Sequence, residues 1–162
     1  MFDLNSYKQA RDVFELLIQR NNNLFNPYLK LGIIYQTLDM EKKALQFLLK
    51  AHEINPISVM TLQIIARIFR TINDKKNSLK YTELAHNLDP YNFLFLHNLK
   101  ELKKEPLANE EKEFILKHIS NDEKITIESK SYGHFLLSAN ANNQKNYKQE
   151  FEYLKLAHQY LY

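Results

Sequence analysis

Apolar and small residues recur along the middle of the chain with two superimposed periods. Within one segment they follow the i, i+3, i+4, i+7 spacing of a helix face, as Tyr28, Leu31, Gly32 and Tyr35 do. Over a longer range the same residue types return after 34 positions. The matched pairs are Leu31 and Ile65, Tyr35 and Phe69, Leu38 and Ile72, Leu45 and Leu79, Ala51 and Ala85, His52 and His86, and Pro56 and Pro90. A constant period of this length predicts repeated helical units.

Each 34-residue unit is predicted to be a pair of helices joined by a short turn. In the first unit, Asn26-Pro27 is expected to start one helix, with Asn26 as N-cap. The turn follows at residues 39–41, and Pro56 stops the second helix because proline cannot continue it. In the second unit, the turn is expected at residues 73–74 and the stop at Pro90.

Small residues occupy the positions where helices must approach closely. Gly32 and Ala66 are expected at the crossing of the two helices within a unit, and Ala51 and Ala85 where a second helix packs on the next unit. A larger side chain there would overpack the contact at a cost of about 1–3 kcal/mol.

The pattern continues less regularly toward both ends of the chain. Residues 4–20 form an amphipathic segment through Ala10, Val13, Phe14, Leu17 and Ile18, which predicts either a cap helix or part of a preceding repeat. We therefore expect one domain over 1–162, divided into 4–20, repeats at 25–58 and 59–92, a degenerate repeat and linker at 93–130, and a terminal hairpin at 131–162. Within the linker, residues 120–128 are polar and expected to be a loop.

The first unit resembles the tetratricopeptide repeat. The resemblance is carried by Tyr28-x2-Leu31-Gly32-x2-Tyr35, followed by Ala44-x3-Leu48, Ala51 and Pro56. The second unit departs from the pattern at Ala66, Ser78 and Thr82 but keeps its register. This resemblance implies an all-α fold, an α-α superhelix of antiparallel helix pairs whose usual role is protein binding.

The C-terminal hairpin is similar to a narrower group. His134-Phe135-Leu136-Leu137, then Tyr147, Phe151, Tyr153 and Ala157, resembles the last repeat before the catalytic domain of bacterial tetratricopeptide-sulfotransferases. The resemblance implies an accessory role beside an enzyme. A sulfonate-donor loop rich in glycine is missing from this chain, since Gly32 and Gly133 are its only glycines and both are expected inside helices.

Composition limits the chemistry that the chain can perform. There is no cysteine, so thiolate nucleophiles, thiolate metal sites and disulfides are excluded. The six histidines show no metal-ligand spacing, and His52 and His86 recur as repeat residues. We expect no enzyme, no catalytic residue, no cofactor and no metal.

The mild net charge of +3 does not call for a nucleic-acid partner. Neither an N-terminal signal pattern nor an apolar stretch of about 18 residues is found, so we expect a cytoplasmic protein with no membrane partner.

The expected function is that of a non-catalytic interaction scaffold that binds a peptide or protein partner. Stacked repeats create a concave groove lined mainly by the first helix of each unit. The residues expected to face it are Leu29, Ile33, Gln36, Met60, Gln63, Arg67, Arg70, His97 and Asn98, extended by Glu101. Arg67 and Arg70 suit an acidic or C-terminal peptide segment, because guanidinium binds carboxylate in a bidentate manner. The alternative is that both arginines pair with acids of neighbouring units.

The terminal helix carries two apolar stripes. One contains Phe151, Leu154, Ala157 and Leu161, and the other Tyr153, Leu156 and Tyr160. Two such stripes predict that the apolar surface of the terminal helix is covered by a further domain, a partner or a second copy of the chain. In the alternative, these side chains pack on residues 105–130.

Overall fold

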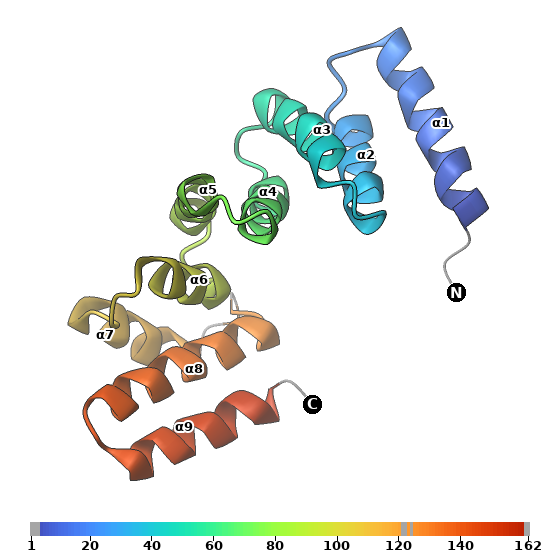
Figure 1. The fold of residues 1–162 in the computed structure, drawn as a ribbon. Helices are drawn as coiled ribbons and strands as arrows, with labels where there is room; N and C mark the ends of the chain where they lie inside the picture. Colours follow the sequence, from blue (N-terminus) through green and yellow to red (C-terminus); the bar gives the residue numbers. More distant parts are fainter. Residues whose placement is uncertain (1–3, 121–122, 124, 161–162) are drawn as a thin grey trace. The chain divides into compact units, whose positions relative to one another are not determined.

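The computed structural model describes residues 4–120, 123 and 125–160, and side chains from residue 7 onward. The described residues form nine α-helices and no strand (Figure 1). The helices are α1 (Leu4–Arg20), α2 (Phe25–Thr37), α3 (Glu41–Ile54), α4 (Val59–Thr71), α5 (Lys75–Leu88), α6 (Phe93–Lys103), α7 (Asn109–His118), α8 (Ile127–Asn143) and α9 (Tyr147–Gln159). The all-α class predicted from the 34-residue period is therefore confirmed. No helix among these residues combines the length and apolarity needed to cross a bilayer.

The chain divides into two compact units, the first ending at Ala85 and the second beginning at His86. In unit 1, the first repeat is the helix pair α2 and α3. Ala44, Leu48 and Ala51 are fully buried in it. Gly32 lies at the crossing of the two helices as expected, because a Cβ atom placed there would lie 2.6 Å from Leu48 Cδ2 and closer still to Leu48 Cγ.

In the second repeat of unit 1, different residues occupy the corresponding helix crossing. Ala66 stands at the position of Gly32 and Thr82 at that of Leu48, and both are buried. Since threonine is smaller than leucine, the methyl group of Ala66 has room that Gly32 lacks. Ser78, which replaces the consensus alanine, donates a hydrogen bond from Oγ to the Ala66 carbonyl at 3.1 Å. The departures from the consensus in this repeat therefore compensate one another.

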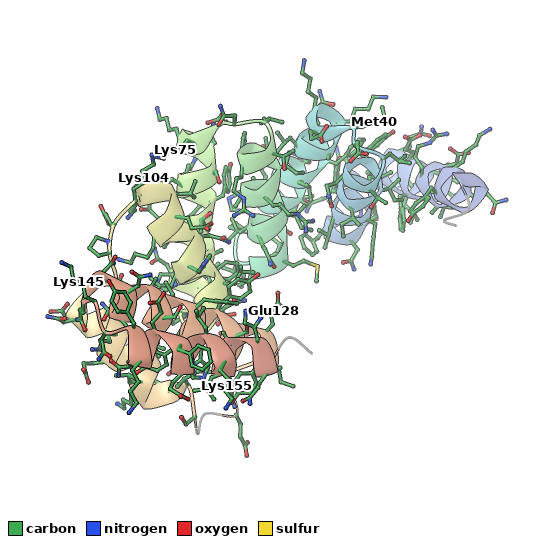
Figure 2. The ribbon with its side chains drawn as sticks, turned by 60° about the horizontal axis from the view of Figure 1, so that its bottom comes forward. Met40, Lys75, Lys104, Glu128, Lys145 and Lys155 are labelled. Carbon is green, nitrogen blue, oxygen red and sulfur yellow. The ribbon has the colours of Figure 1, made fainter. Side chains whose placement is uncertain are left out.

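Four helix pairs share one turn geometry. Asp39, Asn73, Lys104 and Lys145 each have φ between 53° and 61°, in the left-handed region. The next residue in each turn donates a backbone hydrogen bond to the carbonyl five positions earlier: Met40 to Tyr35, Asp74 to Phe69, Glu105 to Lys100 and Asn146 to Ala141. This is the Schellman ending of a helix. Figure 2 shows Lys104 and Lys145 at two of these turns, with Glu128 at the opposite end of α8 from Lys145. The turns thus share one helix ending, although their left-handed residues are 34 positions apart only in unit 1 and then follow after 31 and 41 positions.

Two predicted boundaries were wrong. Helix α2 begins at Phe25, so Asn26 and Pro27 lie within its first turn and Asn26 is not the N-cap. Proline is tolerated there because the first N–H groups of a helix have no partner within the helix. Helix α8 begins at Ile127, earlier than the expected end of the polar loop at residue 128. The Thr126 side chain accepts a hydrogen bond from the Ser129 backbone N–H and caps it. Residues 121, 122 and 124 of that loop lie outside the described residues.

Helix α1 packs on α2 in unit 1. The Tyr35 hydroxyl donates to Glu15 Oε1 at 3.3 Å across this contact. Ala10, Phe14 and Ile18 are half-buried, as the amphipathic pattern predicts. Val13 and Leu17, which belong to the same predicted stripe, remain 56% and 37% exposed. One half of the stripe is therefore uncovered among the described residues.

The core of unit 2 joins α6, α7 and α8. Phe93, Leu96, Ile115, Ile119, Leu136 and Leu137 are among its buried members. Gly133 of α8 lies against this cluster, where an added Cβ would be 2.8 Å from Ile119 Cδ1 and from Phe93 Cδ2. Ser129 ties the start of α8 to the start of α6. Its Oγ donates to the Tyr91 carbonyl at 2.6 Å and accepts from the Phe93 N–H at 2.8 Å.

Candidate functional site: the α2/α4 surface

In unit 1, the predicted groove residues divide between two first helices, α2 and α4. The surface they form, here called the α2/α4 surface, consists of Ile33 and Gln36 on α2 and Met60, Gln63, Arg67 and Arg70 on α4. Met60, Arg67 and Arg70 are exposed, while Ile33, Gln36 and Gln63 are half-buried. These side chains are accessible to a ligand.

Arg67 and Gln36 connect the two helices of this surface. Arg67 Nη2 donates a hydrogen bond to Gln36 Oε1 at 2.9 Å. This partner is a neutral amide from the neighbouring repeat, whereas the alternative from the sequence required an acid. A guanidinium has five N–H donors, so most of those of Arg67 are still available to a carboxylate. The Gln36 amide holds the cation in place without neutralising it.

The charge on the two helices has one sign. Helices α2 and α4 contain no aspartate or glutamate, and their charged residues are Lys30, Arg67 and Arg70. The second helices α3 and α5 differ, because they carry Glu41, Glu53 and Glu83 among their lysines. All charged side chains on the first helices of unit 1 are therefore cationic.

Leu29 does not belong to this accessible surface. It is only 7% exposed. Leucine burial contributes about 1.5–3 kcal/mol, so a leucine beside the buried Tyr28 is drawn into the core. We correct the expectation that its side chain faces a ligand.

In unit 2, His97 and Asn98 lie on α6 and are half-buried. His97 Nδ1 lies 4.0 Å from Glu101 Oε2, and its ring contacts that of Tyr132 with centroids 5.3 Å apart. His97 and Glu101 line a groove of about 660 Å³, together with Lys100, Lys104, Glu105, Pro106, Phe135, Leu136, Ala139 and Asn143. Phe135, Ala139 and Asn143 were not predicted from the sequence as site residues. They lie ten, six and two positions before Lys145, the left-handed residue that follows α8.

The recurring histidines are repeat residues with a common environment. The ring of His52 packs edge-on against Tyr81, 5.7 Å between centroids. The Nδ1 atoms of His52 and His86 are buried without a hydrogen-bond partner. Burial lowers the pKa of both imidazoles from the ordinary value of 6.5, and the charge of Lys80 lowers that of His52 further. Over the part of the chain that is described, no three potential ligands from His, Cys, Asp and Glu are grouped to hold a metal ion.

The two predicted stripes of α9 have different surroundings. Tyr153 packs on the core cluster of unit 2, and Tyr160 stacks on His134 with ring centroids 5.7 Å apart. In the other stripe Ala157 is buried, but Phe151 is 65% exposed and Leu161 lies outside the described residues. Tyr147, one turn before Phe151, is 66% exposed. The second stripe is thus covered by the chain itself, whereas Phe151 is not.

Comparison with known proteins identifies the fold. No protein-family model matches the sequence, and no curated protein matches it either. Among solved structures, the crystal structure of MamA is similar with a TM-score of 0.68 at 16% sequence identity, and the match covers 99% of this chain and 95% of the MamA chain. Together with the helix pairs and their shared turns, this similarity shows a tetratricopeptide-like all-α fold.

Proposed function

We propose that the chain is a non-catalytic interaction scaffold that binds an acidic peptide segment of a protein partner on the α2/α4 surface. The observation that carries the proposal is the hydrogen bond of 2.9 Å from Arg67 to the neutral Gln36 amide, on two helices without a single acid. An arginine held in place by a neutral partner keeps its charge for a ligand, and this is the role that we propose for Arg67.

The spacing of these residues defines the peptide. Met60 and Arg67 are seven positions apart on α4, which is about 10 Å at a rise of about 1.5 Å per residue. An extended peptide advances about 3.3 Å per residue, so this distance corresponds to about three residues. The preferred segment has an apolar side chain near Met60 and one or two acids three to four residues away, near Arg67 and Arg70.

Fluorescence anisotropy with a labelled Leu-Ser-Ser-Glu-Glu peptide tests the proposal. A partly exposed ion pair contributes up to about 1 kcal/mol, so Arg67→Ala and Arg70→Ala should each weaken binding by about five-fold. Lys42→Ala removes a charge of the same sign from α3, a second helix of unit 1 outside the α2/α4 surface, and is the matched control. A Leu-Ser-Ser-Gln-Gln peptide should bind more weakly than the acidic one. Equal affinity of the double arginine variant and the parent protein for the acidic peptide would refute the proposal.

A second candidate function starts from the exposed Tyr147 and Phe151 on α9. In this proposal, the chain is the accessory region of a tetratricopeptide-sulfotransferase, and this aromatic face contacts a catalytic domain that the chain does not contain. A sulfotransferase reading frame directly downstream, with loss of its association in a Phe151→Ser variant, would support this function. The same substitution tests self-association, since a second copy covering α9 would make the sedimentation coefficient depend on Phe151.

A further inference from the structure

The groove of unit 2, here called the α6/α8 groove, has an apolar and a polar part. Its apolar lining is Phe135, Leu136 and Ala139 of α8 with Pro106, and its exposed polar residues, here called the rim, are Glu101, Lys104, Glu105 and Asn143. Its volume of about 660 Å³ lies within the range of about 300–1,000 Å³ that is typical of ligand pockets. The Phe135 ring lies perpendicular to that of His158 at a centroid distance of 5.6 Å, and this contact orients it.

The shared turns explain why a groove exists here. Six positions before the left-handed turn residue lie Ile33 on α2, Arg67 on α4, Asn98 on α6 and Ala139 on α8. Ten positions before it lie Leu29, Gln63, Leu94 and Phe135. Helix α8 therefore carries a methyl group where α4 carries a guanidinium, and a phenyl ring where α4 carries an amide. These two exchanges turn a cationic position into an apolar depression.

The charges around the groove compensate one another. Lys100 Nζ lies 2.6 Å from Glu111 Oε2, and His97 lies 4.0 Å from Glu101. Lys104 and Glu105 on the rim carry opposite signs. In contrast to the acid-free α2 and α4, this site provides no net field that would select an anion or a cation.

We propose that the α6/α8 groove is a binding site for an uncharged peptide segment that packs an aromatic or large aliphatic side chain against Phe135 and Ala139. The exposed Asn143 at the rim has a carboxamide that both donates and accepts, as a peptide bond requires. The site extends the proposed function with a ligand chemistry different from that of the α2/α4 surface. Either site can fail its test while the other passes.

Titration of the full chain with N-acetyl-L-phenylalanine amide, followed by NMR, tests this site. The Ala139 methyl and the Asn143 side-chain amide should shift in a saturable manner. Ala139→Leu fills the depression and should weaken binding at least ten-fold, as read from the Asn143 signal. Ala108→Leu, at an exposed alanine outside the groove, should leave the affinity unchanged.

Four results would overturn the proposal. The first is the absence of saturable shifts at the groove. The second is an Ala139→Leu variant that binds as well as the parent chain. The third is an equal response to N-acetyl-L-aspartate amide, which would show that the groove does not select an uncharged side chain. The fourth is binding of octanoate in place of the phenylalanine amide, which would indicate an acyl chain as the occupant.

Discussion

The packing at the crossing of α2 and α3 can be tested sharply, because the two repeats of unit 1 have different residue pairs at this crossing. Replacing Gly32 by alanine places a methyl group 2.6 Å from Leu48 Cδ2, and Leu48 is fully buried. In the second repeat, the same two positions hold Ala66 and Thr82 without conflict. We therefore compare the effect of Gly32→Ala on the free energy of unfolding with and without Leu48→Thr.

Two opposing effects set the magnitude. Overpacking costs about 1–3 kcal/mol. Alanine is favoured over glycine in a helix interior by about 1 kcal/mol. In the parent chain, Gly32→Ala should therefore lower the free energy of unfolding by about 0–2 kcal/mol. With Leu48→Thr present the overpacking disappears. Gly32→Ala should then raise the free energy of unfolding by up to about 1 kcal/mol.

The assay is urea unfolding followed by far-UV circular dichroism for the four proteins of this double-mutant cycle. The expected coupling energy between the two positions is about 1–3 kcal/mol. Gly133→Ala is the matched control, since its overpacking involves Ile119 and Phe93 and should not be relieved by Leu48→Thr. Additive effects of Gly32→Ala and Leu48→Thr, within about 0.5 kcal/mol, would refute the compensation described here.

Three further predictions concern stability. Burial lowers the pKa of the half-buried His52 and His86 below 6.5, so the unfolded chain takes up protons before the folded chain as pH falls through this value, and the free energy of unfolding decreases. The urea midpoint should therefore fall less between pH 7.5 and 5 in a His52→Gln, His86→Gln variant than in the parent chain. Lys145→Gly should raise the free energy of unfolding by about 1 kcal/mol, because residue 145 has a φ of 57° that glycine adopts freely, and an unchanged midpoint would contradict this. Ser129→Ala should lower the free energy of unfolding by about 1–3 kcal/mol, since the Phe93 N–H is left buried without a partner. Thermal unfolding measures this loss.

The sequence predicted the helix pairs because tandem repeats place the same small and apolar residues at the same contacts. The predicted turns at residues 39–41 and 73–74 agree with helices that end at Thr37 and Thr71 and resume at Glu41 and Lys75. The boundary at Phe25 was missed because its N-cap, Leu24, makes no side-chain capping hydrogen bond. At Ile127, the cap is Thr126, inside a stretch whose polarity indicates a loop.

The candidate binding surface follows less directly from the sequence than the fold does. Arg67 and Arg70 could be placed from the helix period, but the Gln36 partner of Arg67 depends on how far the two first helices approach each other. Leu29 lies between the packed and open faces of its helix, and the period alone does not decide such a position. The α6/α8 groove was missed because the consensus side chains fade after residue 92 and the spacing of the turns departs from 34 residues there.

The central claim is that unit 1 presents a cationic recognition surface on its first helices. The most direct test is to map the backbone amide shifts of the full chain as the Leu-Ser-Ser-Glu-Glu peptide is added. We predict saturable shifts concentrated on α2 and α4, strongest around Gln36 and Arg67, that weaken as salt screens the charges. Shifts located on α3 and α5, or none at millimolar peptide, would contradict the claim.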